Sequence, residues 1–285
     1  MRKKLVATCD MNNRKIEYIL SGDLGLSGNI IKKLKASGGI LLNGKNAHVN
    51  QRLSMGDELE LIFPEETSGN IIAENIPIEV LYEDEDILVV NKPPFMITHP
   101  VGEHKSGTLA NAVMFYLEND ASFHVITRLD KETSGVVLIA KNAISAQKLN
   151  AAMKERQIEK EYVALVCGEL PQNEGAIDVP IIKGDGIKRM TSPDGKEALT
   201  KYEVVEEVNG LSLVRVQPLT GRTHQIRVHL ASLGTPIYGD WLYGRAIEGE
   251  RIRLHCRKIS FTHPLKNTEI TIAAATPQDI TSLIK

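Results

Sequence analysis

The chain carries seven short apolar runs, all after residue 77, that have the length and composition of β-strands. Two of them are separated only by Asn209-Gly210, a pair that favours a tight β-hairpin. Few helix-length segments interrupt the series, so the order predicts an α+β fold with a largely antiparallel sheet. The runs are IEVLY (78–82), ILVVN (87–91), VVLIA (136–140), YVALV (162–166), YEVVEEV (202–208), LSLVRVQ (211–217) and ITIA (270–273), and helical segments lie near 108–118 and 144–156.

The composition is that of an ordinary globular protein. The 285 residues are 42% hydrophobic and 25% charged, which leaves room for one large domain and a small one. No apolar run approaches the roughly 20 residues of a membrane helix, and LVATC near the N-terminus is too short for a signal peptide. The cysteines show no metal-binding spacing and suit a reducing compartment. We therefore expect a cytoplasmic monomer with no membrane association; its cysteines are Cys9, Cys167 and Cys256.

The net charge of −2 hides a division along the chain. Residues 1–64 hold ten basic and six acidic residues, which gives +4, whereas residues 65–100 hold one and eight, which gives −7. Residues 65–77 are polar and acidic and read as a linker. We expect a small anion-binding domain at 1–64, an acidic linker at 65–77 and a catalytic domain at 78–285. Chance variation of charge along the chain explains the net charge of +4 in residues 1–64 equally well.

The first segment reads as a helix, a short helix and a hairpin. Ser27 is the expected N-cap of a helix that Gly38 and Gly39 would stop. The following ILLNGKNAHV predicts strand, Asn-Gly turn and strand, and a last strand carries Leu59 and Leu61. Three lysines cover the exposed side of the helix, which on composition alone favours a solvated face over a binding site; they are Lys32, Lys33 and Lys35.

Three polar motifs interrupt the apolar elements of the second part. Arg128-Leu129-Asp130 comes just before the run at 136–140, and Tyr162 begins another run. Taken singly, an aspartate before a turn is most often a turn residue, and a strand tyrosine is most often a core residue. The third motif is GRTHQIRVHLASLGTP, residues 221–236.

The segment 221–236 predicts an amphipathic helix. Thr223 is the expected N-cap, and Gly234 followed by Pro236 is the expected stop. Arg227 and His224 fall beside the apolar stripe, and Arg222 lies just ahead of the helix. A helix N-terminus favours anions, so the three form a candidate anion site. An equally good interpretation is that these residues are surface arginines and a histidine that caps the helix, with no anion site. The apolar stripe of the helix consists of Ile226, Leu230 and Leu233.

Five motifs, in this order, resemble the RluA-type pseudouridine synthases, which modify uridines in ribosomal or transfer RNA. The likeness spans roughly 78–275 and implies the pseudouridine synthase fold. Residues 12–63 are similar to the S-four-like RNA-binding domain that often precedes it. Thr127 departs from the histidine that the family often has there. The motifs are NKPPFMITHP (91–100), RLDKETSGVVLIAK (128–141), KEYVALVCG (160–168), GRTHQIRVHLASLGTPIYGDWLYG (221–244) and LHCRKISFTHP (254–264).

The resemblance implies a role for each matching residue. Asp130 would be the catalytic nucleophile, Tyr162 would stack on the uracil and take part in proton transfer, and Arg227 would pair with the aspartate. Arg128 matches the residue that helps to fill the gap left by the flipped base. Arg222 and His224 are expected to bind substrate, as members of the candidate anion site.

These residue types suit an isomerisation. A stacked base is out of reach, so the nucleotide must flip out of the RNA, and stacking on an aromatic ring offsets the cost. A guanidinium beside a buried carboxylate keeps it charged. Hydrolytic glycosidases commonly use two carboxylates, whereas the motifs here offer one clear carboxylate, Asp130. Without a Gly-rich phosphate loop or a metal-ligand cluster in the sequence, we expect neither cofactor nor metal.

The sequence thus predicts an RNA pseudouridine synthase, with large-subunit ribosomal RNA the first expected partner and transfer RNA the second. One alternative is a non-catalytic RNA-binding protein or ribosome-assembly factor on the same fold. Another is a nucleoside or RNA glycosidase, which would release free uracil.

Overall fold

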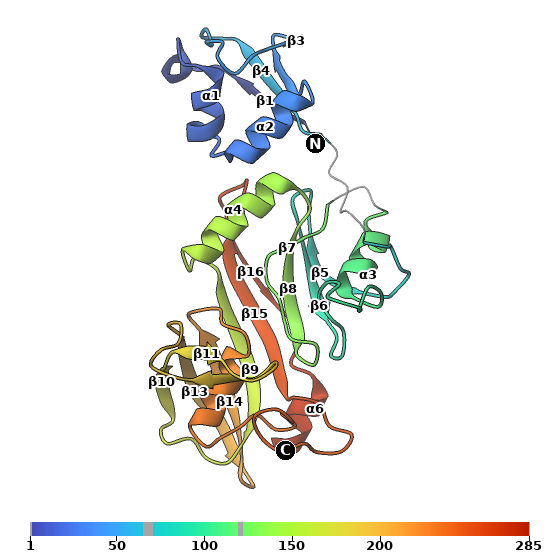
Figure 1. Ribbon diagram of the computed structural model, residues 1–285, viewed down its shortest axis with the longest axis vertical. Helices are drawn as coiled ribbons and strands as arrows, with labels where there is room; N and C mark the ends of the chain where they lie inside the picture. The colour runs from blue at the N-terminus through green and yellow to red at the C-terminus, as the bar shows by residue number, and fades with distance from the viewer. Residues whose placement is uncertain (1, 65–70, 119–121, 285) are drawn as a thin grey trace.

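The computed structural model describes residues 2–64, 71–118 and 122–284. Figure 1 shows a small N-terminal unit at one end and a long sheet below it. Of the predicted linker 65–77, residues 65–70 lie outside the described residues. Residues 71–77 form neither helix nor strand, and Asn111 donates a hydrogen bond to the carbonyl of Ile72.

The N-terminal unit is a four-stranded antiparallel sheet, in the order β1-β4-β2-β3, packed on a helix. Strand β1 was not predicted. Its sequence, RKKLV, reads as a basic tail, because an edge strand with partly exposed side chains needs little apolar pattern. The elements are β1 (Arg2–Val6), η1 (Cys9–Met11), α1 (Ile16–Tyr18), η2 (Ile19–Asp23), α2 (Gly28–Ala36), β2 (Ile40–Leu42), β3 (Lys45–Asn46) and β4 (Glu58–Ile62).

Several local predictions for this unit are confirmed. The Ser27 side chain caps α2 by accepting a hydrogen bond from the backbone N–H of Ile30. Asn43 and Gly44 both have positive φ, as the tight turn between β2 and β3 requires. The predicted lysine face of α2 is exposed to solvent.

The large sheet follows the order β10-β13-β14-β9-β15-β8-β6-β5, with β16 paired to β15 and β7 to β8. Every pairing is antiparallel except the one between β8 and β15, so the predicted largely antiparallel sheet is confirmed. A separate ribbon joins β11 and β12. The strands are β5 (Glu79–Glu83), β6 (Ile87–Lys92), β7 (His124–Val125), β8 (Ser134–Ala140), β9 (Glu159–Cys167), β10 (Glu174–Asp178), β11 (Ile181–Lys183), β12 (Arg189–Thr191), β13 (Leu199–Val208), β14 (Leu211–Pro218), β15 (Leu254–Thr262) and β16 (Glu269–Ala273).

Strand β15 lies at the centre of this sheet, although its sequence did not predict a strand. LHCRKISFT mixes charged and apolar residues, which hides the period of two. It runs parallel to the start of β8, with Cys256 opposite Gly135. A Cβ at Gly135 would lie 2.2 Å from the Cys256 carbonyl oxygen, so only glycine fits there. This close approach fixes the start of β8, and with it the loop before β8, against the middle of the sheet.

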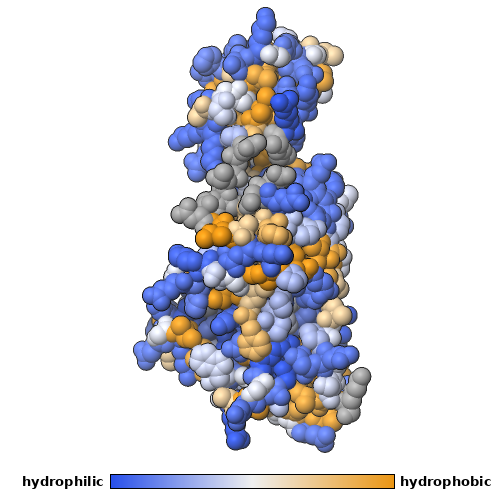
Figure 2. All heavy atoms as spheres, turned by 90° about the vertical axis from the view of Figure 1, so that its right-hand side faces the viewer, coloured by the Kyte–Doolittle hydropathy of each residue, from blue (hydrophilic) through white to orange (hydrophobic). Residues whose placement is uncertain are grey.

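Helices cover the sheet and join the two parts of the molecule. Ile144 of α4 packs into the core of the N-terminal unit, and Gln147 accepts a hydrogen bond from the backbone of Ser27. Figure 2 shows the side of the molecule that carries α3, where apolar side chains gather beside polar ones. No helix of the described residues is long and apolar enough to cross a membrane. The helices are α3 (Leu109–Tyr116), α4 (Ala143–Lys154), α5 (Gln225–Ser232), α6 (Gln278–Thr281) and η3 (Ser282–Ile284).

Candidate active site

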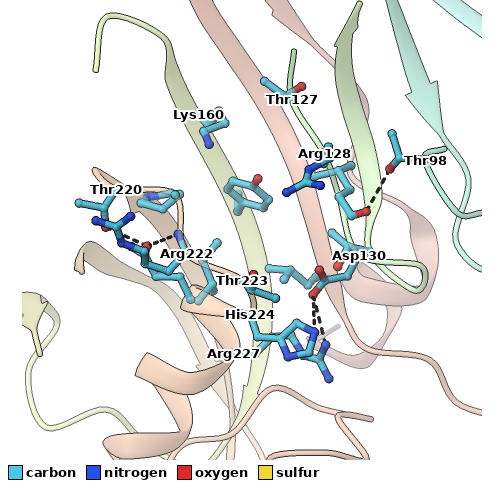
Figure 3. Close-up of a pocket in the computed structure, with 18 of the residues that line it drawn as sticks. Thr98, Thr127, Arg128, Asp130, Lys160, Thr220, Arg222, Thr223, His224 and Arg227 are labelled. Atoms are coloured by element: carbon cyan, nitrogen blue, oxygen red, sulfur yellow. Dashed lines mark hydrogen bonds and ion pairs between the residues drawn. The ribbon is translucent and has the colours of Figure 1, made fainter. Parts of the chain in front are cut away.

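A pocket of about 500 Å³ opens where β8, β9 and α5 begin (Figure 3). All six predicted site residues line it, although they come from three distant parts of the chain. The pairing of β15 with both β8 and β9 brings the first two parts together. Strand β14, which pairs with β9, leads into the turn before α5 and so places the third part. The six are Arg128, Asp130, Tyr162, Arg222, His224 and Arg227.

The loop that carries Asp130 is held from both sides. The Thr98 hydroxyl donates to the carbonyl of Leu129 at 3.1 Å, and the backbone N–H of Thr133 donates to the carbonyl of Asp130 at 3.1 Å. Thr127, where the family often has histidine, is buried, and its hydroxyl accepts a hydrogen bond from the Leu138 backbone at 2.9 Å. Thr127 therefore ties the loop to β8, and its side chain is a structural contact here.

Lys92 is a site residue that sequence reasoning missed. It is fully buried at the end of β6, and its ammonium donates to the carbonyls of Met96 and Lys131 at 2.8 and 3.3 Å. Burial lowers the pKa of Lys92 to about 7, although Asp130 acts in the opposite direction. Lys92 therefore cross-links the two loops beside Asp130; in the sequence it ends an apolar run and is the second residue of the motif NKPPFMITHP.

Arg227 is shared between two carboxylates. Its guanidinium donates to Asp240 through Nε at 2.7 Å and Nη2 at 2.8 Å, and Nη1 lies 3.2 Å from Asp130 Oδ2. The side chains of Asp240 and Arg227 are 0% and 5% exposed, whereas that of Asp130 is 33% exposed and faces the pocket. Burial would lower the pKa of Arg227, but Asp240 and Asp130 raise it above its ordinary value. The arginine is thus a permanently charged, fixed partner for Asp130.

The start of α5 differs from the prediction. Thr223 is not the N-cap: the helix begins at Gln225, and His224 takes the N-cap position with a left-handed φ of 57°. The Gln225 side chain instead organises the turn, because its Oε1 accepts hydrogen bonds from the Thr220 hydroxyl and the Arg222 backbone. This turn directs His224 toward Asp130, with Nε2 3.7 Å from Oδ2. Burial lowers the pKa of His224, which favours the neutral ring.

The predicted anion site of Arg222, His224 and Arg227 does not form as one cluster. His224 and Arg227 face Asp130, because the anion at the helix start is the protein's own carboxylate. The Nε of Arg222 instead donates to the carbonyl of Glu197 at 2.8 Å. Arg128 is exposed at the pocket rim, and no ion pair joins it to Asp130. Figure 3 shows Arg222 well apart from His224 and Arg227.

Tyr162 is buried, with 7% of its surface exposed, and lines the pocket at the start of β9. It lies opposite Cys256 of β15 in the pairing of the two strands. Burial raises the pKa of Tyr162 well above its ordinary value, and Cys256 and Asp130 add to the effect. The side chain therefore rests as a neutral phenol that can hold or pass on a proton.

Among the described residues, three side chains outside the pocket have the spacing of a metal site, but each already has hydrogen-bond partners in the protein. Asp84 Oδ2 accepts from His263 Nε2 at 3.0 Å and from the Lys266 ammonium at 2.7 Å. Burial would raise the pKa of Asp84, but the bond from Lys266 and two backbone N–H groups hold it below its ordinary value. Asp86, the third member, accepts from Asn142 and Ser145. These hydrogen bonds join the turn between β5 and β6 to the residues that follow β8 and β15.

Comparison with known proteins agrees with the motifs. A family model described as RNA pseudouridylate synthase matches residues 86–232. The chain is 40% identical over 273 residues to the uncharacterized RNA pseudouridine synthase YjbO of Bacillus subtilis (strain 168), covering 93% of this chain and 96% of that protein. It is 34% identical to ribosomal large subunit pseudouridine synthase D of Xanthomonas campestris, covering 87% and 81%. The solved structure of human RNA pseudouridylate synthase domain containing 1 is similar, with a TM-score of 0.63 and 26% identity over 73% of this chain and 88% of that one.

Proposed function

We propose, from the premise that this chain belongs to the RNA pseudouridylate synthase family and is an isomerase, that it converts uridine in ribosomal RNA to pseudouridine with Asp130 as the reacting carboxylate. One observation carries the assignment. Asp130 is the single acidic residue among the described residues that line the pocket, and a buried arginine holds it there.

The chemistry requires one bond to break and another to form at the same sugar carbon. The bond from uracil nitrogen 1 to the ribose is cleaved, and carbon 5 of uracil takes its place. The hydrogen on carbon 5 leaves as a proton, and nitrogen 1 takes up a proton. Asp130 supplies the negative charge beside the sugar, and Arg227 fixes its position. Tyr162 supplies the aromatic surface and a neutral hydroxyl for the base.

The arrangement favours isomerisation over hydrolysis. Glycosidases place two carboxyl groups on either side of the bond, one of them to protonate the leaving group or activate water. Here Asp240 is fully buried against Arg227, and Glu132 accepts a hydrogen bond from the Trp241 indole at 2.9 Å. Neither lines the pocket with Asp130. A site with one carboxylate has no second acid to activate water against the sugar.

The substrate follows from the relatives and can be tested directly. The Xanthomonas campestris relative is named for the large ribosomal subunit, which makes that RNA the first candidate. Large-subunit ribosomal RNA and transfer RNA, each prepared with tritium at uridine carbon 5, should be incubated separately with the protein. We expect tritium release from the ribosomal RNA. Release only from transfer RNA would overturn the substrate assignment, and release from neither would overturn the proposed function.

Tyr162→Phe should separate stacking from proton transfer. The ring that contacts the base remains, so RNA affinity should stay within about 3-fold of wild type, because stacking does not need the hydroxyl. Loss of the hydroxyl should slow product formation by about 100-fold or more if it takes part in proton transfer. The measurement is the single-turnover rate of tritium release at saturating RNA. Tyr202→Phe, a buried tyrosine outside the pocket, is the matched control. Full activity in Tyr162→Phe would leave stacking as its whole role.

We propose that residues 1–64 form an RNA-binding domain of the S-four-like type, joined by the linker 65–77 to a catalytic domain at 78–285. The exposed lysines of α2 support this, since each phosphate contact adds to the salt dependence of binding. Lys32→Gln/Lys35→Gln should weaken RNA binding and flatten the plot of log affinity against log salt by about one to two units. Lys4→Gln is the control, because Glu58 already pairs with Lys4 at 2.9 Å. An unchanged salt slope in the double variant would argue against phosphate contacts by α2.

A further inference from the structure

Lys160 faces the pocket but has no place in the mechanism above. It lies two residues before Tyr162 on β9, so the two side chains leave the strand on the same face. Both line the pocket. Figure 3 shows Lys160 at the end of the pocket away from the labelled Asp130, His224 and Arg227. Its ammonium is therefore positioned to meet a different part of the substrate from the part that meets Asp130.

The structure gives this cation no counter-ion. Within the described residues, no hydrogen bond or ion pair joins Lys160 to a carboxylate. The adjacent Glu161 points to the opposite face of β9 and pairs there with Arg257 and Lys258 at 2.7 and 3.0 Å. The one acidic group that acts on the pKa of Lys160 among the described residues is the Cys256 thiol, and burial raises the pKa of that thiol to about 12, so it is neutral.

A partly buried cation without an anion is unfavourable in the empty pocket. Burial lowers the pKa of Lys160 below its ordinary value, as expected for an ammonium that has lost water and gained no partner. An anion bound beside it would favour its charged form and would be held more strongly than at an open surface. Arg128 and Arg222 line the same pocket, so three cations line it in addition to Arg227, which is occupied by carboxylates.

We propose that Lys160 binds a backbone phosphate of the RNA next to the flipped-out uridine. The inference rests on the proposed function, because it takes RNA as the occupant of the pocket. Phosphate is the anionic group that accompanies every uridine in RNA, whereas the uracil ring enters the site neutral. An ammonium is a compact point charge that suits phosphate. The whole chain is slightly acidic, with a net charge of −2, so local cations of this kind must attract the RNA.

The test uses the full-length protein and the RNA from which the wild type releases tritium. Lys160→Met should weaken RNA binding and reduce the salt slope by about one phosphate contact, roughly 0.7 to 0.9 units. Lys160→Arg should restore both. The single-turnover rate at saturating RNA should remain within a few-fold of wild type. Lys201→Met removes an exposed lysine of the same sheet outside the pocket, and should change neither quantity.

A neutral phosphate identifies the contact. RNA with a methylphosphonate on the 5′ or 3′ side of the target uridine should bind less tightly to the wild type at one of the two positions. In Lys160→Met, the same methylphosphonate should weaken RNA binding no further. If Lys160→Met keeps wild-type affinity and salt slope, the inference is wrong. If it loses only the saturating rate, the lysine acts on the uracil instead, which also overturns the inference. A wild type that releases no tritium from either RNA is a failure of the proposed function.

Discussion

Asp130→Asn should reduce tritium release from uridine-labelled RNA to background while the protein still folds and binds RNA. The change is nearly isosteric, and the side chain is one-third exposed at the pocket wall, so little packing is lost. Among the residues that the structure describes, it removes the one acidic group that lines the pocket. Loss of a nucleophile typically lowers the rate by about 10⁴-fold or more. The comparison is the single-turnover rate of the two proteins at equal RNA occupancy.

The matched control for this prediction is Glu132→Gln. Glu132 lies two residues further along the same loop, outside the pocket lining, and accepts a hydrogen bond from Trp241. Its substitution changes charge in the same loop by the same amount but should leave the rate within a few-fold of wild type. Substantial activity in Asp130→Asn would show that Asp130 is not the nucleophile. Equal losses in both variants would show a general effect of charge in the loop.

Asp240→Ala should damage both stability and activity. Asp240 is fully buried. It accepts two hydrogen bonds from the Arg227 guanidinium and one from the backbone N–H of Leu242. Removing one partner of a buried ion pair leaves an uncompensated charge and typically costs about 3–5 kcal/mol. The freed guanidinium would also hold Asp130 less firmly, so the rate should fall by about 100-fold, as when a group is misplaced by 1 Å.

Two measurements separate these effects. Urea unfolding gives the free energy of unfolding, and the tritium-release rate is taken at a temperature where the variant remains folded. Asp185→Ala, which removes an exposed aspartate, should stay within about 0.5 kcal/mol of wild type. Asp240→Asn keeps the shape of the side chain but loses its charge. Its free energy of unfolding and its tritium-release rate should lie between those of Asp240→Ala and Asp185→Ala. An Asp240→Ala protein with wild-type stability and rate would show that the arginine needs no second carboxylate.

Sequence patterns were sufficient where local chemistry determines the structure. Asn209 and Gly210 have the positive φ values of a tight hairpin turn, and β13 and β14 pair on either side of them as predicted. The runs of β-branched residues in β6 and β8 became buried strands for the same reason. Strand β15 was missed because its place at the centre of the sheet comes from pairing with β8 and β9, which no local pattern records.

The candidate site was predictable in part. The motifs pointed to Asp130, Tyr162 and Arg227, and the fold brings all three to one pocket. Asp240 and Lys92 were not expected, because their importance lies in burial and in distant hydrogen bonds. The start of α5 was placed one residue too early, with Thr223 in place of His224 as the N-cap, because the Gln225 amide binds the preceding turn and replaces a conventional cap.

Conversion of uridine to pseudouridine with Asp130 as the reacting carboxylate can be tested directly in one reaction. RNA labelled with tritium at uridine carbon 5 is incubated with the wild type, without added cofactor and with a chelator present. Released tritium, pseudouridine in the RNA and free uracil are then measured in the same sample. The account predicts one tritium released for each pseudouridine formed and no free uracil, with all three absent in Asp130→Asn. Free uracil in place of pseudouridine, or unchanged product from Asp130→Asn, would contradict it.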